Sequence, residues 1–379
     1  MRPVQRDLTT FACYFLLALL TLFLAMPGPL TPALMRDLGL GFTQASLHSV
    51  AQAAGMAVTG ATGERFVQRF GRNGCVRLSL VLLSTGFVLL CSAVHPAMSL
   101  TGAFLMGCGG SLTLMAANAA MAERHSAHAS IVFGEANVIA YLGIVAAPGI
   151  VSLMTAFAHW RWTVLVSLSA VLVFLAFFHR AEFGAPPARR RSVERRPLGF
   201  AYWCFWCLLM TSVAAEGTLL IWTAAYFERQ LGWASELALL ASMTFPAGVF
   251  VARATGVLLV RRFPVRRLVL PTIALSVAGF LLFRYGGAGA LALAGLVIAG
   301  FGMGNLYPFG ITLALAATEG DRDTATARVS LASAVSMITL PLIVGSIADR
   351  SDLATAFAAV PVCLALAAIA TVVGLGRAR

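Results

Sequence analysis

Twelve long apolar segments recur along the chain, and they constrain its fold more than any other feature. A helix needs about 20 mostly apolar residues to cross a bilayer, and a chain of 379 residues leaves about 32 residues for each segment and its loop. Because 59% of the residues are hydrophobic and only 11% are charged, the composition excludes a soluble enzyme. We predict an all-α polytopic membrane protein whose transmembrane helices begin near residues 11, 43, 75, 98, 130, 160, 200, 236, 268, 289, 327 and 353.

The positive charge of the chain is distributed unevenly between alternate loops. All 27 basic residues are arginine, and the formal net charge is +12. Of these arginines, 21 lie in the termini and in the loops on one side, whereas five lie in the opposite loops. Because cytoplasmic loops carry the basic excess, we expect both termini in the cytoplasm and no nucleic-acid partner. Exclusive use of arginine is typical of a GC-rich genome and favours a bacterial inner membrane.

The longest hydrophilic stretch lies midway along the chain and contains two arginine clusters. It suggests an N-terminal bundle at 1–178, a basic cytoplasmic linker at 179–198 and a C-terminal bundle at 199–379. The halves show weak repetition, because Gly107 corresponds to Gly300 and Pro148 to Pro341. Two six-helix pseudo-repeats that enclose a site near the midplane are typical of secondary transporters.

The loop after the second apolar segment carries a recognisable motif. Its sequence Gln68-Arg69-Phe70-Gly71-Arg72-Asn73 resembles the Asp-Arg-x-Gly-Arg-Arg signature of the major facilitator superfamily. The resemblance implies the twelve-helix fold of that family, in which this loop acts as a conformational switch that braces the two halves. Here Gln68 replaces the acid of the signature and Asn73 replaces its last arginine, and Glu64, one turn earlier, could substitute for the acid.

Two further segments resemble different branches of the same family. Gly134, Gly143 and Pro148 match most of its antiporter motif, although small residues also serve ordinary helix packing. Residues 216–226, with Glu216, Trp222 and Tyr226, resemble the seventh span of fucose-permease-like members, which transport sugars and related polar solutes. The first resemblance favours export and the second favours uptake.

Three charged residues lie clearly within apolar segments. They are Glu135, Glu216 and Arg253, and each costs at least about 2.5 kcal/mol at a helix centre, which makes it a functional candidate. Glu216 could hold and release a proton, or it could be a static hydrogen-bonded acid. Glu135 and Arg253 could pair across the halves as an inner gate, or Arg253 could bind carbonyl groups on its own.

Neutral polar and aromatic residues complete a candidate cavity. Asn137 and Tyr141 are four residues apart and should share one helical face. Each candidate could instead serve packing or interfacial anchoring. The full set of neutral candidates is Asn118, Asn137, Tyr141, Trp222, Tyr226, Asn305 and Tyr307.

Together these features predict a proton-coupled secondary transporter that works by alternating access. Efflux of a small amphipathic compound or metabolite by antiport is slightly favoured over uptake of a sugar or other polar solute by symport. The chain has no lysine, so it lacks the phosphate-binding Gly-x-x-x-x-Gly-Lys-Ser/Thr motif and cannot drive transport with ATP on its own.

Other classes of function find little support in the sequence. An intramembrane enzyme would need paired acids or a serine and histidine within reach, and a non-transporting sensor would usually add a signalling module. Cys204 and Cys207 lack the further ligands of a metal site. We expect no catalytic residue, cofactor or metal, and a monomer whose partners are its substrate and the lipid bilayer.

Overall fold

The computed structural model describes residues 6–125, 128–184, 198–287, 289–318 and 322–377. Within these ranges every regular element is helical and no strand occurs. The chain divides into unit 1, residues 1–40 and 47–189, and unit 2, residues 41–46 and 190–379. Most of the predicted linker, residues 185–197, lies outside the described residues.

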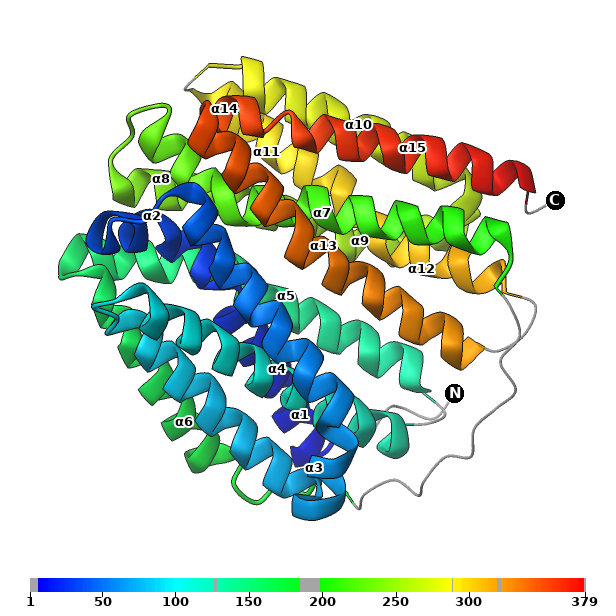
Figure 1. Ribbon diagram of the computed structural model, residues 1–379. Coiled ribbons are helices and arrows are strands. Elements are labelled where there is room, and N and C mark those ends of the chain that lie inside the picture. Colours follow the sequence, from blue (N-terminus) through cyan, green and yellow to red (C-terminus); the bar gives the residue numbers. More distant parts are fainter. Residues whose placement is uncertain (1–5, 126–127, 185–197, 288, 319–321, 378–379) are drawn as a thin grey trace. The chain divides into compact units, whose positions relative to one another are not determined.

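Unit 1 contains the first group of helices (Figure 1). Helix α1 packs against both α4 and α5. The first residues of α3 are grouped with unit 2. The elements are α1 (Leu8–Ala25), α2 (Pro27–Leu38), α3 (Phe42–Cys91), α4 (Pro96–Arg124), α5 (Ala129–Phe157), the 3-10 helix η2 (Trp160–Thr163) and α6 (Val164–Phe177).

Unit 2 repeats this type of bundle with its own core. Helix α7 packs against α13 and α15, and α11 packs against α9 and α10. The elements are α7 (Phe200–Arg229), α8 (Ser235–Ser242), α9 (Thr244–Arg262), α10 (Val265–Tyr285), α11 (Ala290–Met303), α12 (Leu306–Ala316), α13 (Arg322–Arg350), α14 (Leu353–Ala356) and α15 (Ala359–Arg377).

Eleven helical segments among the described residues are long and apolar enough to cross a membrane. One of them, α3, has 50 residues and is broken at Gly71, whose φ of 67° lies in the left-handed region. At 1.5 Å per residue, an unbroken α3 would measure about 75 Å, more than twice the apolar core of a bilayer. Its arms at residues 42–70 and 72–91 are consistent with one span each, which would give the predicted twelve.

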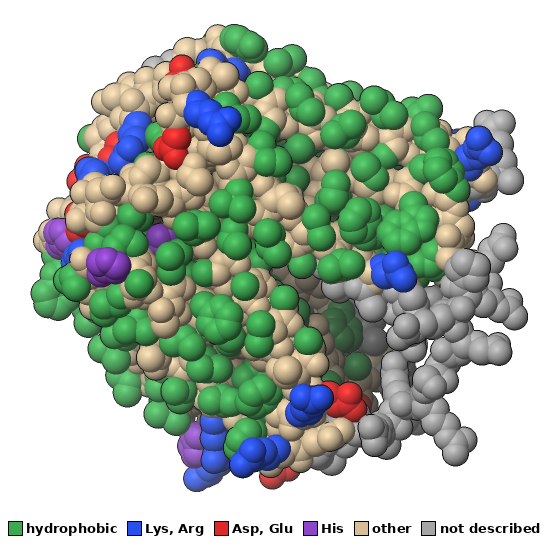
Figure 2. All heavy atoms as spheres, in the orientation of Figure 1, with side chains coloured by type: hydrophobic (Ala, Val, Ile, Leu, Met, Phe, Trp, Pro, Cys, Tyr) green, Lys and Arg blue, Asp and Glu red, His purple; other side chains and the backbone are tan. Residues whose placement is uncertain are grey.

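The accessible surface fits a protein surrounded by lipid. Large apolar side chains are exposed along α6, including Leu168 and Leu172 at 55% and 66%. Apolar side chains cover much of the face in Figure 2, and the charged side chains are few and lie mostly toward its margins. Such a surface is stable in a bilayer, whereas in water it would promote aggregation.

Glycines at equivalent positions set the close approach of helices within each unit. A side chain at Gly55 would collide with the carbonyl oxygen of Phe104, and one at Gly107 with that of Gln52. Adding 193 to each number gives the corresponding contacts of unit 2, where Gly248 faces Val297 and Gly300 faces Phe245. The same offset relates Pro148 to Pro341, so the repeat seen in the sequence corresponds to repeated helix packing.

Substitution of these glycines tests the repeat. We expect Gly107→Val and Gly300→Val each to lower the free energy of unfolding by about 1–3 kcal/mol, because the added methyl groups meet backbone atoms of a neighbouring helix. The measurement is the melting temperature of the purified protein in detergent. Gly134→Ala is the control, because a Cβ there meets nothing within 4 Å. Wild-type melting of both valine variants would contradict the packing argument.

Candidate functional site

One face of α7 is accessible along most of its length. Its half-buried residues follow one another at spacings of three and four, which places them on one side of the helix, whereas the residues between them are buried. We call this face the α7 stripe. It comprises Trp206, Cys207, Met210, Val213, Glu216, Gly217, Leu220 and Ile221.

An ion pair lies on the α7 stripe. The Arg253 guanidinium on α9 lies 3.6 Å from the Glu216 carboxylate, and the two side chains are 22% and 12% exposed. Two opposite charges in an apolar setting stabilise one another, and removing one leaves the other uncompensated. The intramembrane acid and base of this unit are therefore neutralised by each other, yet both remain partly accessible.

The space next to this pair is open. A Cβ built at Gly217 would meet no atom of the described residues within 4 Å. Glycine at this position keeps the stripe free of a side chain directly beside Glu216. A small solute could therefore approach the ion pair along the face of α7.

Two predicted cavity residues of α7 lie deeper in unit 2. Trp222 is fully buried, and its indole nitrogen has no hydrogen-bond partner among the described residues. Tyr226 is also buried and stacks on Phe357 with the ring centroids 5.0 Å apart, and its hydroxyl accepts a hydrogen bond from Arg284. Neither ring lies on the α7 stripe, so substrate contact would require a rearrangement.

The two candidates near the junction of α11 and α12 differ in their surroundings. Asn305 is buried and donates a hydrogen bond of 2.8 Å from Nδ2 to the carbonyl oxygen of Ala252 on α9. Gly256 leaves room for the Asn305 amide, since a Cβ there would collide with it. Asn305 therefore connects α9 to the end of α11, whereas Tyr307 is half-buried and more accessible.

The acid of unit 1 has partners that the sequence analysis missed. Arg6, just before α1, binds Glu135 through two hydrogen bonds of 3.0 and 2.5 Å, and the Tyr14 hydroxyl donates a third of 2.7 Å. Glu135 and Arg253 were predicted to pair across the halves, but the structure gives each a partner within its own unit. Arg6 and Glu135 are 129 residues apart, so no local spacing indicates their contact.

The remaining polar candidates of unit 1 lie at different depths. Asn137 is exposed and donates to the carbonyl oxygen of Phe133, whereas Tyr141 is 4% exposed. Asn118 on α4 is half-buried. Asn137 and Tyr141 are one turn apart, as expected, but only Asn137 is readily accessible.

The antiporter-like residues on α5 differ in their surroundings, because Gly143 lies in a close helix contact and Gly134 does not. Gly143 allows α5 to approach the backbone of Ala18 on α1, and Pro148 lies inside α5. A Cβ at Gly134 would meet nothing within 4 Å. Ordinary packing therefore accounts for Gly143, but no packing contact explains Gly134.

The loop motif forms an ion pair with a residue outside the motif. Arg72 is 2% exposed and binds the Glu123 carboxylate of α4 in a bidentate ion pair with N–O distances of 2.5 Å. Arg72 also donates to the carbonyl oxygen of Phe183. Glu64 accepts a hydrogen bond from Gln68 within α3, so the acid beside Arg72 is Glu123, which the sequence analysis did not identify. The only signal was the acid-base pair Glu123-Arg124 at the end of an apolar segment.

Among the described residues, no three His, Cys, Asp or Glu side chains gather as a metal site would require. The seven cysteines are free thiols. Among the ion-paired acids of the described residues, Glu135 and Glu216 are the two that the sequence places clearly within apolar segments.

Comparisons with known proteins agree with this architecture. None of the curated proteins matches the sequence. The fold is similar to a D-xylose-proton symporter, with a TM-score of 0.78 at 16% identity over 96% of each chain. It is also similar to a bacterial homolog of the human lysosomal transporter Spinster in an inward-facing and unoccupied conformation, with a TM-score of 0.69 at 15% identity over 97% of this chain and 94% of that one.

A family model described as Major Facilitator Superfamily matches residues 13–316. The match includes the loop motif, the two ion-paired acids and the glycines that set the repeated packing. The protein is therefore a multi-pass membrane protein that belongs to the major facilitator superfamily of transporters.

Proposed function

We propose that the protein is a proton-coupled transporter that moves a small molecule across a bacterial cytoplasmic membrane, with Glu216 as the coupling acid. The observation that carries this proposal is the partly accessible ion pair of Glu216 and Arg253, 3.6 Å apart on the α7 stripe. Ionisable residues within membrane spans mark ion and substrate pathways, because their cost is tolerated only where they act. We further propose that the protein works as a monomer with both termini in the cytoplasm.

The favoured direction is efflux by antiport. The six residues of the α7 stripe other than Glu216 and Gly217 are apolar or aromatic, which suits the apolar part of an amphipathic compound. The deprotonated Glu216 carboxylate would bind a positive or hydrogen-bond-donating group of that compound. A proton arriving at Glu216 removes the negative charge and releases the compound, so proton and substrate compete for one group.

Arg253 supports a second candidate, uptake by symport. Protonation of Glu216 would weaken its attraction for Arg253, whose guanidinium could then donate to the oxygens of a sugar or another polar solute. The proton and the solute would bind together. The buried Trp222 nitrogen could become a further donor if a rearrangement uncovered it.

Flux measurements on proteoliposomes test the role of Glu216 and the direction of coupling. A panel of amphipathic amines and monosaccharides is tested as substrates. An imposed pH gradient should drive the accumulation of at least one of these compounds in proteoliposomes that contain the wild type. Glu216→Gln should lose this accumulation, because glutamine does not exchange a proton. The control is Glu182→Gln, which changes an exposed acid outside the site.

The direction of proton movement separates the two candidates. Antiport predicts that adding substrate outside substrate-free vesicles drives protons out of the lumen, and symport predicts that it carries protons into the lumen. Full gradient-driven accumulation by Glu216→Gln would show that Glu216 is not the coupling acid.

A double-mutant cycle tests the energetic link between Glu216 and Arg253. Each single neutral variant, Glu216→Gln or Arg253→Gln, should lower the free energy of unfolding by up to about 3 kcal/mol, because it leaves one charge uncompensated. The double variant should lose less than the sum of the two. The melting temperatures of the four proteins measure the coupling, and additive losses would mean that the pair does not interact.

The role of Glu135 is tested by comparing Glu135→Gln with Arg6→Gln. We expect Glu135→Gln to weaken apparent substrate affinity several-fold while gradient-driven accumulation remains, because Glu135 is a second accessible acid but not the coupling acid. Arg6→Gln removes the main partner of Glu135 and tests whether the effect arises from the ion pair alone. Both side chains are about one third exposed, so solvent screens their attraction and the pairing should contribute little to stability. If Glu135→Gln and Arg6→Gln showed equal transport defects, the effect would come from loss of the ion pair, and Glu135 would have a structural role only.

A further inference from the structure

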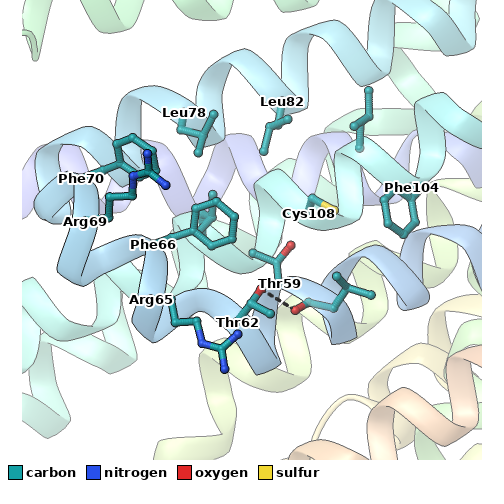
Figure 3. Close-up of a pocket in the computed structure, with 13 residues that line it drawn as sticks. Thr59, Thr62, Arg65, Phe66, Arg69, Phe70, Leu78, Leu82, Phe104 and Cys108 are labelled. Atoms are coloured by element: carbon teal, nitrogen blue, oxygen red, sulfur yellow. Dashed lines mark hydrogen bonds between the residues drawn. The ribbon is translucent and has the colours of Figure 1, made fainter. Parts of the chain in front are cut away.

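A groove of about 640 Å³ lies within unit 1, apart from the two ion-paired acids. Its walls come from both arms of α3 and from α4, as Figure 3 shows. Apart from Arg65 and Arg69, the lining residues are apolar or threonine: Val58, Thr59, Thr62, Phe66, Phe70, Leu78, Leu82, Phe104, Leu105, Cys108 and Leu112. The groove is therefore apolar apart from two cationic side chains.

The two arginines lie in the half of this groove that is nearer the break of α3 at Gly71. Arg69 lies beside Phe70 at the end of the groove and Arg65 lies next to Thr62, whereas Phe104 and Cys108 lie toward the other end (Figure 3). Both arginine side chains are exposed, and neither forms an ion pair with any described residue. The nearby acid Glu64 does not line the groove and accepts a hydrogen bond from Gln68.

The polar atoms inside the groove are few. The Thr62 hydroxyl donates a hydrogen bond of 2.8 Å to the carbonyl oxygen of Val58, so it does not require a polar ligand. Phe66, Leu78 and Leu82 pack against the small core of Val67, Cys75 and Leu112 and form an apolar wall. Such a surface favours hydrocarbon over water.

The length of the groove matches one leaflet of a bilayer. Val58 and Arg69 both line it and are eleven positions apart on one helical arm, which corresponds to about 16 Å. One leaflet contributes about 15 Å of hydrocarbon. An occupant with an anionic head and an acyl tail therefore fits both the charge at one end and the distance to the other.

We propose that this groove binds an anionic phospholipid from the leaflet on the arginine-rich side of the membrane. The phosphate lies between Arg65 and Arg69, and one acyl chain runs past Thr62 toward Phe104. Basic pockets between transmembrane helices recognise anionic head groups. The site does not include the Glu216–Arg253 pair, so the proposal applies equally to an antiporter and to a symporter.

Native mass spectrometry of the full-length protein with phosphatidylglycerol tests the proposal. The double variant Arg65→Gln/Arg69→Gln should bind this lipid about 30-fold more weakly than the wild type, from the attraction of two arginines for an anionic head group. The matched control is Arg266→Gln/Arg267→Gln, which removes two exposed arginines of unit 2 that do not line the groove. The control should bind like the wild type.

Two further measurements locate the lipid and identify its chemistry. Phosphatidylglycerol with a photoreactive acyl chain should crosslink to residues 58–82 and 104–112, and excess inorganic phosphate should not displace it. Equal lipid binding by the groove variant and the control, crosslinks spread around the whole protein, or displacement by free phosphate would overturn the proposal. Equal binding of zwitterionic phosphatidylethanolamine would also overturn it, because the arginines would then have no role.

Discussion

The cost of an uncompensated charge in an apolar environment shapes the interior of both units. Glu216 is neutralised by Arg253 within unit 2, and Glu135 is neutralised by Arg6 and bound by Tyr14 within unit 1. Glu216 on α7 and Arg253 on α9 join two helices, and Arg6 joins the segment before α1 to Glu135 on α5. A proton that reaches either acid changes the charge of the pair, and this links protonation to the contacts between helices.

Much of the helical architecture was predictable from the apolar segments and their repeats. The apolar segments predicted the helices because bilayer thickness imposes a fixed length on each one. The weak similarity around Gly107 and Gly300 corresponds to close backbone contacts in the two units. The sequence did not predict α3 as one helix broken only at Gly71, because backbone angles at a single glycine depend on the packing around the turn.

The candidate site was predictable only in part. Charged residues stand out in an apolar sequence, so Glu135, Glu216 and Arg253 could be named as candidates, but the sequence did not indicate that Glu216 pairs with Arg253 or Glu135 with Arg6. Arg6 and Glu123 lie near helix ends, where charged residues are common and carry no special signal. Tyr226 and Asn305 match the polar and aromatic pattern of a cavity, yet their hydrogen bonds to Arg284 and Ala252 place them in packed regions. Burial of this kind depends on tertiary packing and not on residue type.

Infrared difference spectroscopy tests, without a known substrate, whether Glu216 exchanges a proton next to Arg253. The difference spectrum of the membrane-reconstituted protein between acidic and alkaline pH should contain the carbonyl band of a protonated carboxyl group that is absent from Glu216→Gln. Arg253→Gln should change the frequency of this band, because the carboxyl group loses the guanidinium that lies 3.6 Å away. Identical spectra of the wild type and Glu216→Gln across the pH range would contradict proton exchange at Glu216.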